Sequence, residues 1–430
     1  MQPSVADALV ADSGCSATAL AAGVTALPGT LGLNAQGAAV ESVLERAKRA
    51  GKSVGLVSDT RITHATPAAF VAHVIDRDLE YDIARQIAAS KADVLLSGGR
   101  SFFSKPNGAK ISALELAKTN GFKIANNFND LKSSVISGST PLLGLFAESA
   151  MQNGIAEKQH LALNIDAKNR EPTLVEMSAA ALKLLSKNPE GFFLMIEAGQ
   201  IDWAGHANDA GWLLHEMIRI DSVVDLVAQW QAESPDTLLI VTADHETGGF
   251  GFSYSSAAIP TPHALAAQPS GTLPYAADYN FVSPAVLKNL ARQKTPIAEI
   301  FRQVKVGAQQ PDSAQRLVEL VQSTLGHQIT IKQATDLLTP ERNEFRVPGH
   351  ADLNDELVPK INDFSAFYPK PINRATTALA RLLAARSGIV WATGNHTSTP
   401  VPLFAIGPGQ DSFKGIPTQV DVGAKLASIF

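Results

Sequence analysis

The sequence contains almost no cysteine: among its 430 residues, Cys15 is the only one. A single cysteine excludes a disulfide within the chain and a zinc site built from several thiolates. Any metal ion would therefore be bound by histidine, by aspartate or glutamate, or by hydroxyl oxygens.

The chain also lacks a long apolar run and a strong excess of charge of one sign. No stretch approaches the roughly 18 apolar residues that can span a bilayer. The net charge is −5, which gives no reason to expect a nucleic-acid or membrane-surface partner, although a basic cleft could lie within an acidic average. Residues 1–10 have no basic region and carry Asp7, so they do not resemble a signal peptide. We expect either a cytoplasmic protein or one whose native beginning is absent.

Short apolar runs that end in small or acidic residues predict fully buried strands. These runs are Ser53–Ser58, Asp93–Ser97, Phe192–Ile196, Thr237–Thr242 and Val401–Ile406. Amphipathic segments between them predict helices, at Ala38–Ala50, Thr173–Ser186 and Gly211–Ala232. This alternation predicts an α/β fold with a mostly parallel central sheet and helices on both faces. Ligands in such folds bind at the carboxyl ends of the strands.

Residues 252–389 interrupt the alternation. They open with a Pro/Ser/Ala-rich stretch, Ser255–Leu273, and continue with helical patterns at Ser313–Gly326 and Lys332–Leu338, without clear buried strands. We expect residues 1–251 and 390–430 to form the α/β core. Residues 252–389 would then be an insertion that serves as a cap or a dimer-contact region.

A candidate nucleophile lies near the start of the chain. An Asp-Ser pair at Asp12 and Ser13 is followed by small residues and by a helical pattern from Ser16. Ser13 would then lie at a helix N-terminus, where free N–H groups and the helix dipole favour an anionic phosphate. The alternative is that Asp12 or Ser13 only caps a helix.

Candidate metal ligands follow the strand that ends in Glu197. If a helix begins near Ile201, the i,i+4 spacing of Asp202 and His206 places both on one face. One carboxylate and one imidazole on a shared face suit zinc. A surface pair of the same residues is the alternative.

Two further segments carry histidine beside a predicted strand. Asp244 and His245 directly follow a strand, and the glycines after them let the backbone turn close to a ligand. Their alternative is a turn in which the aspartate bonds its own backbone. His396 lies in the small polar loop Gly394–Pro400 and is either a further ligand or an ordinary loop histidine.

The segment after the first predicted strand adds His64, Thr66 and Arg77. We expect Arg77 near the end of the helix that follows this strand, where its planar guanidinium could bind two phosphate oxygens. Alone it could equally be a surface charge. Taken together, a nucleophile, His/Asp sets, an extra carboxylate and an arginine match two-metal phosphoryl transfer.

In this order the segments resemble the sequence motifs of alkaline phosphatases. VADSGCSATALAAG is similar to the nucleophile segment, and HATPAAFVAHVIDR is similar to the segment of the third metal site and the phosphate-binding arginine. EAGQIDWAGHAND, VTADHETGG and GNHTSTPVPLFAIGP resemble the later metal segments, and PLLGLFAE is also similar to a family stretch. The resemblance covers about Ala8–Gly251 and Thr393–Phe430.

The resemblance implies a hydrolase of phosphate monoesters with two zinc ions and a third, usually magnesium, ion. Asp202, His206 and His396 would bind the first zinc ion, and Asp244 and His245 the second. The family also implies a homodimer and a periplasmic or secreted protein.

The same resemblance makes Ser13 the nucleophile that becomes a phosphoserine and Arg77 the phosphate clamp. Glu197 and Thr66 would belong to the third metal site. His64 stands where some bacterial members carry aspartate, which leaves the identity of the third metal open.

The sequence departs from the family at two further points. Trp203 follows Asp202 where some members have lysine or histidine. Nothing before Ser13 matches the family's first strand with its GDGM-like motif, so we expect that strand and its metal-binding aspartate to be absent from this chain. A family-derived protein without catalysis that binds metal or phosphate is therefore an alternative. A related sulfatase, phosphodiesterase or cofactor-independent mutase is another, although Cys15 is not followed by a sulfatase C-x-P-x-R motif.

Overall fold

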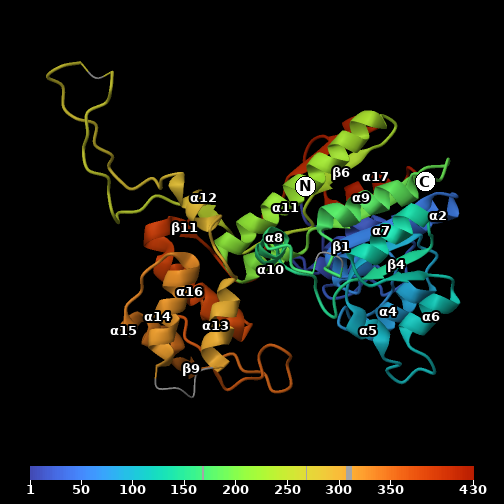
Figure 1. The fold of residues 1–430 in the computed structure, drawn as a ribbon, viewed down its shortest axis with the longest axis horizontal. Coiled ribbons are helices and arrows are strands. Elements are labelled where there is room, and N and C mark those ends of the chain that lie inside the picture. Colours follow the sequence, from blue (N-terminus) through green and yellow to red (C-terminus); the bar gives the residue numbers. More distant parts are fainter. Residues whose placement is uncertain (167–168, 268, 307–311) are drawn as a thin grey trace. The chain divides into compact units, whose positions relative to one another are not determined.

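The computed structural model describes residues 1–166, 169–267, 269–306 and 312–430. Internal packing divides the chain into two units. The core unit consists of Met1–Ile201, Glu216–Glu246 and His396–Phe430, and the second unit consists of Asp202–His215 and Thr247–Asn395. Figure 1 shows the elements of both units.

A five-stranded sheet in the order β3-β4-β2-β1-β5 organises the core unit. Its strands are β1 (Ser53–Arg61), β2 (Val94–Gly98), β3 (Lys123–Ala125), β4 (Leu142–Leu145) and β5 (Phe192–Glu197). All neighbouring strands run parallel, with Leu56 of β1 opposite Leu95 of β2 and Met195 of β5. Ser58 and Glu197 are partners near the carboxyl ends of β1 and β5, which is where a ligand site is expected.

Helices cover both faces of this sheet because successive side chains of a strand point to opposite sides. Val54 and Leu56 of β1 belong to one buried apolar cluster, with residues of α1, α2, α4 and α6. Val57 belongs to a second cluster, with residues of α7, α9 and α11. The predicted α/β fold with a mostly parallel sheet is confirmed (Figure 1).

The helices of the core unit are short, and several begin at an explicit cap. They are α1 (Ser13–Ala22), α2 (Val43–Arg49), α3 (Ala65–Ala68), α4 (Glu80–Ala89), α5 (Arg100–Ser104), α6 (Ala113–Thr119), α7 (Phe128–Ser137), α8 (Gly154–Ala162), α9 (Leu174–Leu185) and α17 (Gln419–Ala427), with a 3-10 turn at Gln410–Phe413. α11 (Ala210–Glu233) belongs to this unit from Glu216 on. The helix predicted at Ala38–Ala50 begins only at Val43, because the side chain of Ser42 caps it reciprocally with Glu45.

Three of the predicted strands are less buried than expected. β6 (Leu239–Thr242) and β13 (Leu403–Ile406) pair with each other antiparallel, and within the described residues neither is hydrogen-bonded to the five-stranded sheet. Phe404 and Ile406 of β13 are 63% and 50% exposed, and the residues of β5 and β6 are half-buried. The prediction of full burial was wrong for these strands, because among the residues that the structure describes each has a strand neighbour on one side only.

The second unit is mainly helical. Its elements are most of α10 (Gln200–His206), then α12 (Ala285–Leu290), α13 (Ile297–Val306), α14 (Ser313–Leu325), α15 (Ile331–Leu338), η1 (Ser365–Phe367) and α16 (Pro371–Ser387), with short strands β8 (Gly251–Phe252), β9 (Pro340–Arg342), β10 (Leu357–Pro359) and β11 (Ile389–Val390). Apolar residues of α13, α14 and α16 form its core, among them Ile300, Phe301, Leu317 and Leu379. Two short pairs join the strands, β9 with β10 and β8 with β11. The interpretation of residues 252–389 as a cap or dimer-contact insertion stays a prediction.

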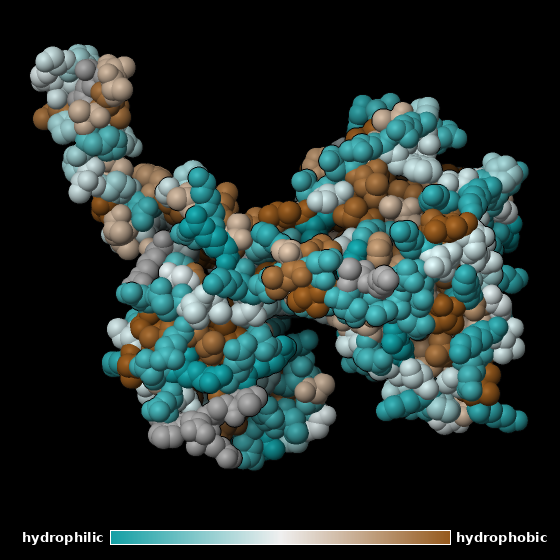
Figure 2. Space-filling model, viewed as in Figure 1, coloured by the Kyte–Doolittle hydropathy of each residue, from teal (hydrophilic) through white to brown (hydrophobic). Residues whose placement is uncertain are grey.

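Residues 253–267 and 269–282 of this unit form a long arm, drawn in yellow in Figure 1. Isolated antiparallel bridges join Ser255 to Asn280 and His263 to Tyr275. Figure 2 shows apolar residues among hydrophilic ones on the face that it draws, and Leu273 and Phe281 of the arm are largely exposed. None of the helices described is both long and apolar enough to cross a membrane.

Candidate functional site

Ser13 is the first residue of α1, and Asp12 is the N-cap of that helix. The Asp12 carboxylate accepts the N–H groups of Cys15 and Gly29, both at 3.0 Å. Asp12 therefore caps the helix, and the hydroxyl of the buried Ser13 can contact other groups. That hydroxyl lies at the positive end of the helix dipole.

His245 and Asp244 meet Ser13 in the core unit. The Oγ atom of Ser13 lies 3.0 Å from Nε2 of His245, and Oδ2 of Asp244 lies 3.3 Å from the same nitrogen. Ser16, one turn after Ser13 on α1, donates its hydroxyl to Oδ2 of Asp244 at 3.0 Å. A hydroxyl, an imidazole and a carboxylate thus converge where the N-terminus of α1 meets the segment after β6.

His396 is held beside this group. Its ring stacks on that of His245 with the centroids 3.6 Å apart. Its Nδ1 lies 2.8 Å from the carbonyl oxygen of Ala11. Because a carbonyl only accepts hydrogen bonds, Nδ1 carries the proton and Nε2 keeps its lone pair, which is the usual arrangement of a metal-binding histidine.

Arg77 also belongs to the core unit, but its placement on a helix was wrongly predicted. The helix α3 ends at Ala68, and Arg77 lies in a turn before α4. Val74 exchanges two backbone hydrogen bonds with Leu31, both at 3.0 Å, and this pairing replaces the helical hydrogen bonds expected there. Arg77 donates to Oδ2 of Asp12 at 2.9 Å.

The surroundings of Asp12 keep it charged. Burial by itself would raise the pKa of Asp12, but the N–H groups of Cys15 and Gly29 and the guanidinium of Arg77 lower it to about 2. His64, the residue just before α3, lies with Nε2 3.3 Å from a terminal nitrogen of Arg77. Asp12 therefore remains negatively charged and orients Arg77 through their ion pair. The sequence motifs alone did not indicate this role.

A second oxygen-rich group surrounds Glu197 at the end of β5. Ser58 and Thr60 of β1 both donate their hydroxyls to Glu197, that of Thr60 at 3.1 Å. Thr66 makes a further side-chain hydrogen bond to Glu197. Burial raises the pKa of Glu197, and these three hydroxyls oppose the rise. Sequence reasoning missed Ser58 and Thr60, although their period-two spacing on a strand places them on one face.

A buried ion pair fixes the turn that follows Glu197. The carboxylate of Asp59 accepts the N–H groups of Gly199 at 2.8 Å and Gln200 at 3.3 Å. Arg219 of α11 lies 3.5 Å from Oδ2 of Asp59 and binds Glu216 at 2.5 Å. Burial raises the pKa of Asp59, and the charge of Arg219 opposes this. The network thus ties Gly199 and Gln200 to the end of β1.

Asp202 and His206 lie in the second unit, on α10, as the i,i+4 spacing predicts. Oδ2 of Asp202 is 3.3 Å from Nε2 of His206. Nδ1 of His206 is 2.6 Å from the carbonyl oxygen of Gly394, which accepts a hydrogen bond from this nitrogen. Of the predicted site residues, these two lie in the second unit, and the others lie in the core unit.

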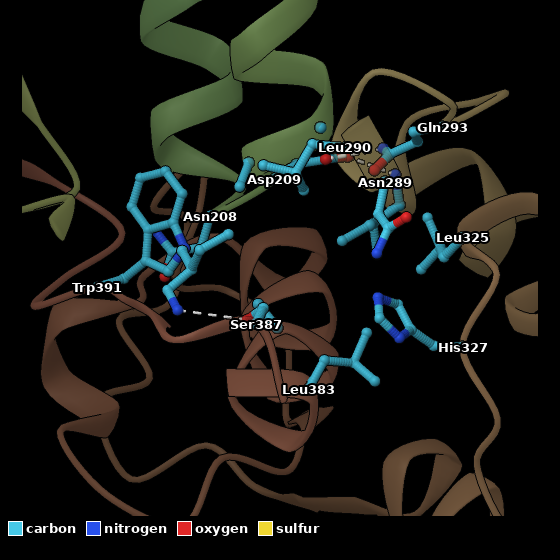
Figure 3. Close-up of a pocket in the computed structure, with 15 residues that line it drawn as sticks. Asn208, Asp209, Asn289, Leu290, Gln293, Leu325, His327, Leu383, Ser387 and Trp391 are labelled. Carbon is cyan, nitrogen blue, oxygen red and sulfur yellow. Dashed lines mark hydrogen bonds between the residues drawn. The ribbon is translucent and has the colours of Figure 1, made fainter. Parts of the chain in front are cut away.

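The second unit also contains a pocket that includes none of the predicted site residues. In Figure 3, Asn289 and His327 point toward one another across it, with Leu325 and Leu383 at its wall. Gln293 donates to Asp209 at 2.8 Å on another side of the pocket. Asp209 also accepts the N–H of Trp212 at 3.0 Å at the start of α11. These bonds fix the turn that follows His206.

The donor atoms fit metal ions of two kinds. Imidazole Nε2 and carboxylate oxygens, as in Asp202 with His206 and in Asp244 with His245, are ligands that zinc prefers. The hydroxyl and carboxylate oxygens around Glu197 are of the kind that magnesium prefers.

Comparisons with known proteins all identify the same family. The alkaline phosphatase family model matches residues 1–312. Alkaline phosphatase 4 of Bacillus subtilis is 28% identical over 425 residues, which are 97% of this chain and 76% of the relative. Alkaline phosphatase 3 of the same organism is 30% identical over 412 residues, which are 94% of this chain and 74% of the relative.

A solved structure agrees with these sequence matches. The cold-active alkaline phosphatase of a Shewanella species superposes with a TM-score of 0.71 at 27% identity, over 100% of this chain and 88% of that one. The α/β fold, the family model and the Bacillus relatives all point the same way, and the chain belongs to the alkaline phosphatase family.

Proposed function

We propose that this protein hydrolyses phosphate monoesters through a phosphoserine formed on Ser13. The observation that carries the proposal is the position of the Ser13 hydroxyl, at the N-terminus of α1 and 3.0 Å from Nε2 of His245. Arg77, held by Asp12 at 2.9 Å, supplies a guanidinium whose remaining N–H groups can bind phosphate oxygens.

Two zinc ions and a third ion complete the proposed site. From the resemblance to alkaline phosphatases we assign Asp202, His206 and His396 to the first zinc ion, since a carboxylate and two imidazoles suit zinc. Asp244 and His245 are assigned to the second zinc ion.

The third ion is assigned to Glu197, Thr66 and His64. The oxygen atoms around Glu197 favour magnesium, whereas the imidazole of His64 leaves the identity of this metal open. When bound, such ions supply positive charge that lowers the pKa of a nearby hydroxyl and offsets the charge of phosphate oxygens.

The residues of this chain have distinct parts in the proposed reaction. The hydroxyl of Ser13 loses its proton to solvent and its Oγ forms a bond to phosphorus, while the bond from phosphorus to the alcohol oxygen breaks and that oxygen takes up a proton from water. Water then hydrolyses the phosphoserine and releases phosphate. The α1 N-terminus and Arg77 bind the phosphate oxygens throughout, and so much positive charge suits a dianionic monoester better than a diester.

The assembly and location of the protein are proposed from the family alone. We propose a homodimer to which residues 252–389 contribute, and a periplasmic or secreted protein. Light scattering of the full chain would measure the mass of the assembly. A monomer at micromolar concentration would count against the dimer.

The nucleophile is tested by Ser13→Ala. We expect turnover of a chromogenic phosphate ester to fall by at least about 1,000-fold, because the bond-forming atom is gone. Ser178→Ala is a matched control, since it also removes a buried serine hydroxyl, which there donates to a helix carbonyl of α9, and it should leave turnover unchanged.

Mass spectrometry after incubation with phosphate at acid pH identifies the labelled residue. We expect phosphate on Ser13 of the unmodified chain and none on the Ser13→Ala variant. Phosphate on Ser16 or Ser58 instead would refute the assignment. A chain that binds zinc but never turns over the ester would support the alternative, a family-derived protein without catalysis.

A further inference from the structure

Thr247 makes a contact that none of the proposed roles uses. Its hydroxyl donates to Oδ1 of Asp202 at 2.5 Å within the second unit. Thr247 is the last residue of the short strand β7 (Glu246–Thr247) and Asp202 lies on α10, so the bond ties two separate segments. The acceptor is a carboxylate, which makes the bond stronger than one between neutral groups.

The two oxygens of Asp202 therefore face different partners. Thr247 takes Oδ1, while Oδ2 lies 3.3 Å from Nε2 of His206. The ring of His206 is fixed in turn by the carbonyl of Gly394, 2.6 Å from Nδ1. Hydrogen bonds to the other oxygen of Asp202 and to the other ring nitrogen of His206 thus hold Oδ2 and Nε2 3.3 Å apart. A carboxylate free to rotate would not keep Oδ2 in that place.

Glycines allow Thr247 to come this close to α10. A Cβ atom on Gly205 would lie 3.0 Å from Cβ and Cγ2 of Thr247, which is closer than such atoms normally approach. Gly248 has a φ of +93°, and a Cβ there would lie 3.0 Å from the carbonyl oxygen of Gly205. The backbone after Thr247 can therefore run against α10 only because both positions lack a side chain.

We propose that Thr247 is a positioning residue that holds Asp202 in the orientation needed to bind zinc together with His206. The proposal rests on the assignment of a zinc ion to Asp202 and His206 made above. Groups that hydrogen-bond a metal ligand from behind typically contribute 10- to 100-fold to metal affinity, because they fix the ligand before the ion arrives.

Competition between the full chain and a zinc chelator of known affinity tests the proposal. Thr247→Val keeps the shape of the side chain and removes the hydroxyl, and we expect zinc affinity at this site to fall by about 10- to 100-fold. Thr247→Ser keeps the hydroxyl and should retain most of the affinity. Gly205→Ala should weaken zinc binding without touching the hydroxyl, because it displaces Thr247 from α10.

Thr376→Val is the matched control. Thr376 is buried in the same unit, and its hydroxyl donates to the backbone carbonyl of Asn373 at 3.1 Å. We expect this variant to bind zinc like the unmodified chain. Thermal unfolding of each variant in excess chelator shows whether the metal-free chain remains folded.

The measured zinc affinities test the positioning role of Thr247 separately from the assignment of zinc to Asp202 and His206. Unchanged zinc affinity in Thr247→Val would overturn the positioning role, as would equal losses in Thr247→Ser or in Thr376→Val. Asp202→Asn reports on the zinc assignment itself. If that variant binds zinc as tightly as the unmodified chain, the zinc site is wrongly assigned, whatever Thr247 does.

Discussion

Replacing Asp12 with asparagine would test how the charge at the N-terminus of α1 is maintained. Asparagine is as good an N-cap as aspartate, so Asp12→Asn keeps an acceptor for the N–H groups of Cys15 and Gly29. The change removes the negative charge that faces Arg77 at 2.9 Å. The effect of the variant is therefore mainly electrostatic.

The magnitude follows from the pKa of Asp12, which is lowered from 3.8 to about 2. Each pKa unit corresponds to ~1.4 kcal/mol, so the charged form of Asp12 contributes about 2 kcal/mol to the free energy of unfolding. Because the folded pKa is depressed, this contribution is fully present well above pH 4 and is lost as the pH falls through 2. At pH 3 about half of it remains.

Urea unfolding of the metal-free chain and of Asp12→Asn, between pH 3 and pH 7, measures this contribution. We expect the variant to be less stable by about 2 kcal/mol at pH 6, with the difference shrinking to about 1 kcal/mol at pH 3. Asp12→Ala, which also removes the cap, should cost roughly 1 kcal/mol more at every pH. A difference between the unmodified chain and Asp12→Asn that is the same at pH 3 and pH 6 would refute the electrostatic reasoning.

Two other predictions concern the packing of α1. Gly23→Ala should lower the free energy of unfolding by more than about 2 kcal/mol, because Gly23 has a φ of +68° and its new Cβ would lie 2.6 Å from the backbone nitrogen of Ala424. Gly37→Ala, with a φ of +77° and open space around it, should cost only about 1 kcal/mol in the same urea titration, and equal losses would contradict the steric argument. Burial and the charge of Asp12 raise the pKa of the Cys15 thiol, so iodoacetamide at pH 8 should label Cys15 in urea and not in the folded chain. Rapid labelling without urea would show that the thiol is accessible.

The order of strands and helices in the core unit was largely predictable from sequence. Apolar runs such as Ser53–Ser58 place apolar side chains on both faces of a strand and so require burial on both sides. These runs are strands of the parallel sheet. The antiparallel pairing of β6 with β13 and their partial exposure were not predictable, since a short apolar run does not indicate which strands will be its neighbours. Arg77 was misplaced for a similar reason, because the backbone pairing of Val74 with Leu31 joins segments far apart in the sequence.

The candidate site, too, was only partly predictable from the sequence. Motifs predicted the segments that carry Ser13, Asp244, His245 and His396, and the core unit brings these four together. The partners that orient them were missed. In the sequence Thr247 is an ordinary threonine, and only the approach of β7 to α10 gives its hydroxyl the carboxylate of Asp202 as a partner. Backbone acceptors leave no sequence signal at all.

That last property has a consequence for mutational tolerance. The rings of His206 and His396 are oriented by carbonyl groups of Gly394 and Ala11, and every amino acid supplies a carbonyl. No single substitution can delete such an acceptor; it can only move it. A comparison of homologues should therefore find no polar residue retained for this purpose at position 11, where any small side chain that fits the buried space would serve. Position 394 should accept glycine alone, because a Cβ there would lie 2.6 Å from the ring of Tyr368. The orientation of these two histidines thus depends on the path of the backbone at positions 11 and 394. In a library of variants, the tolerated side chains at these positions should be limited by size and not by polarity.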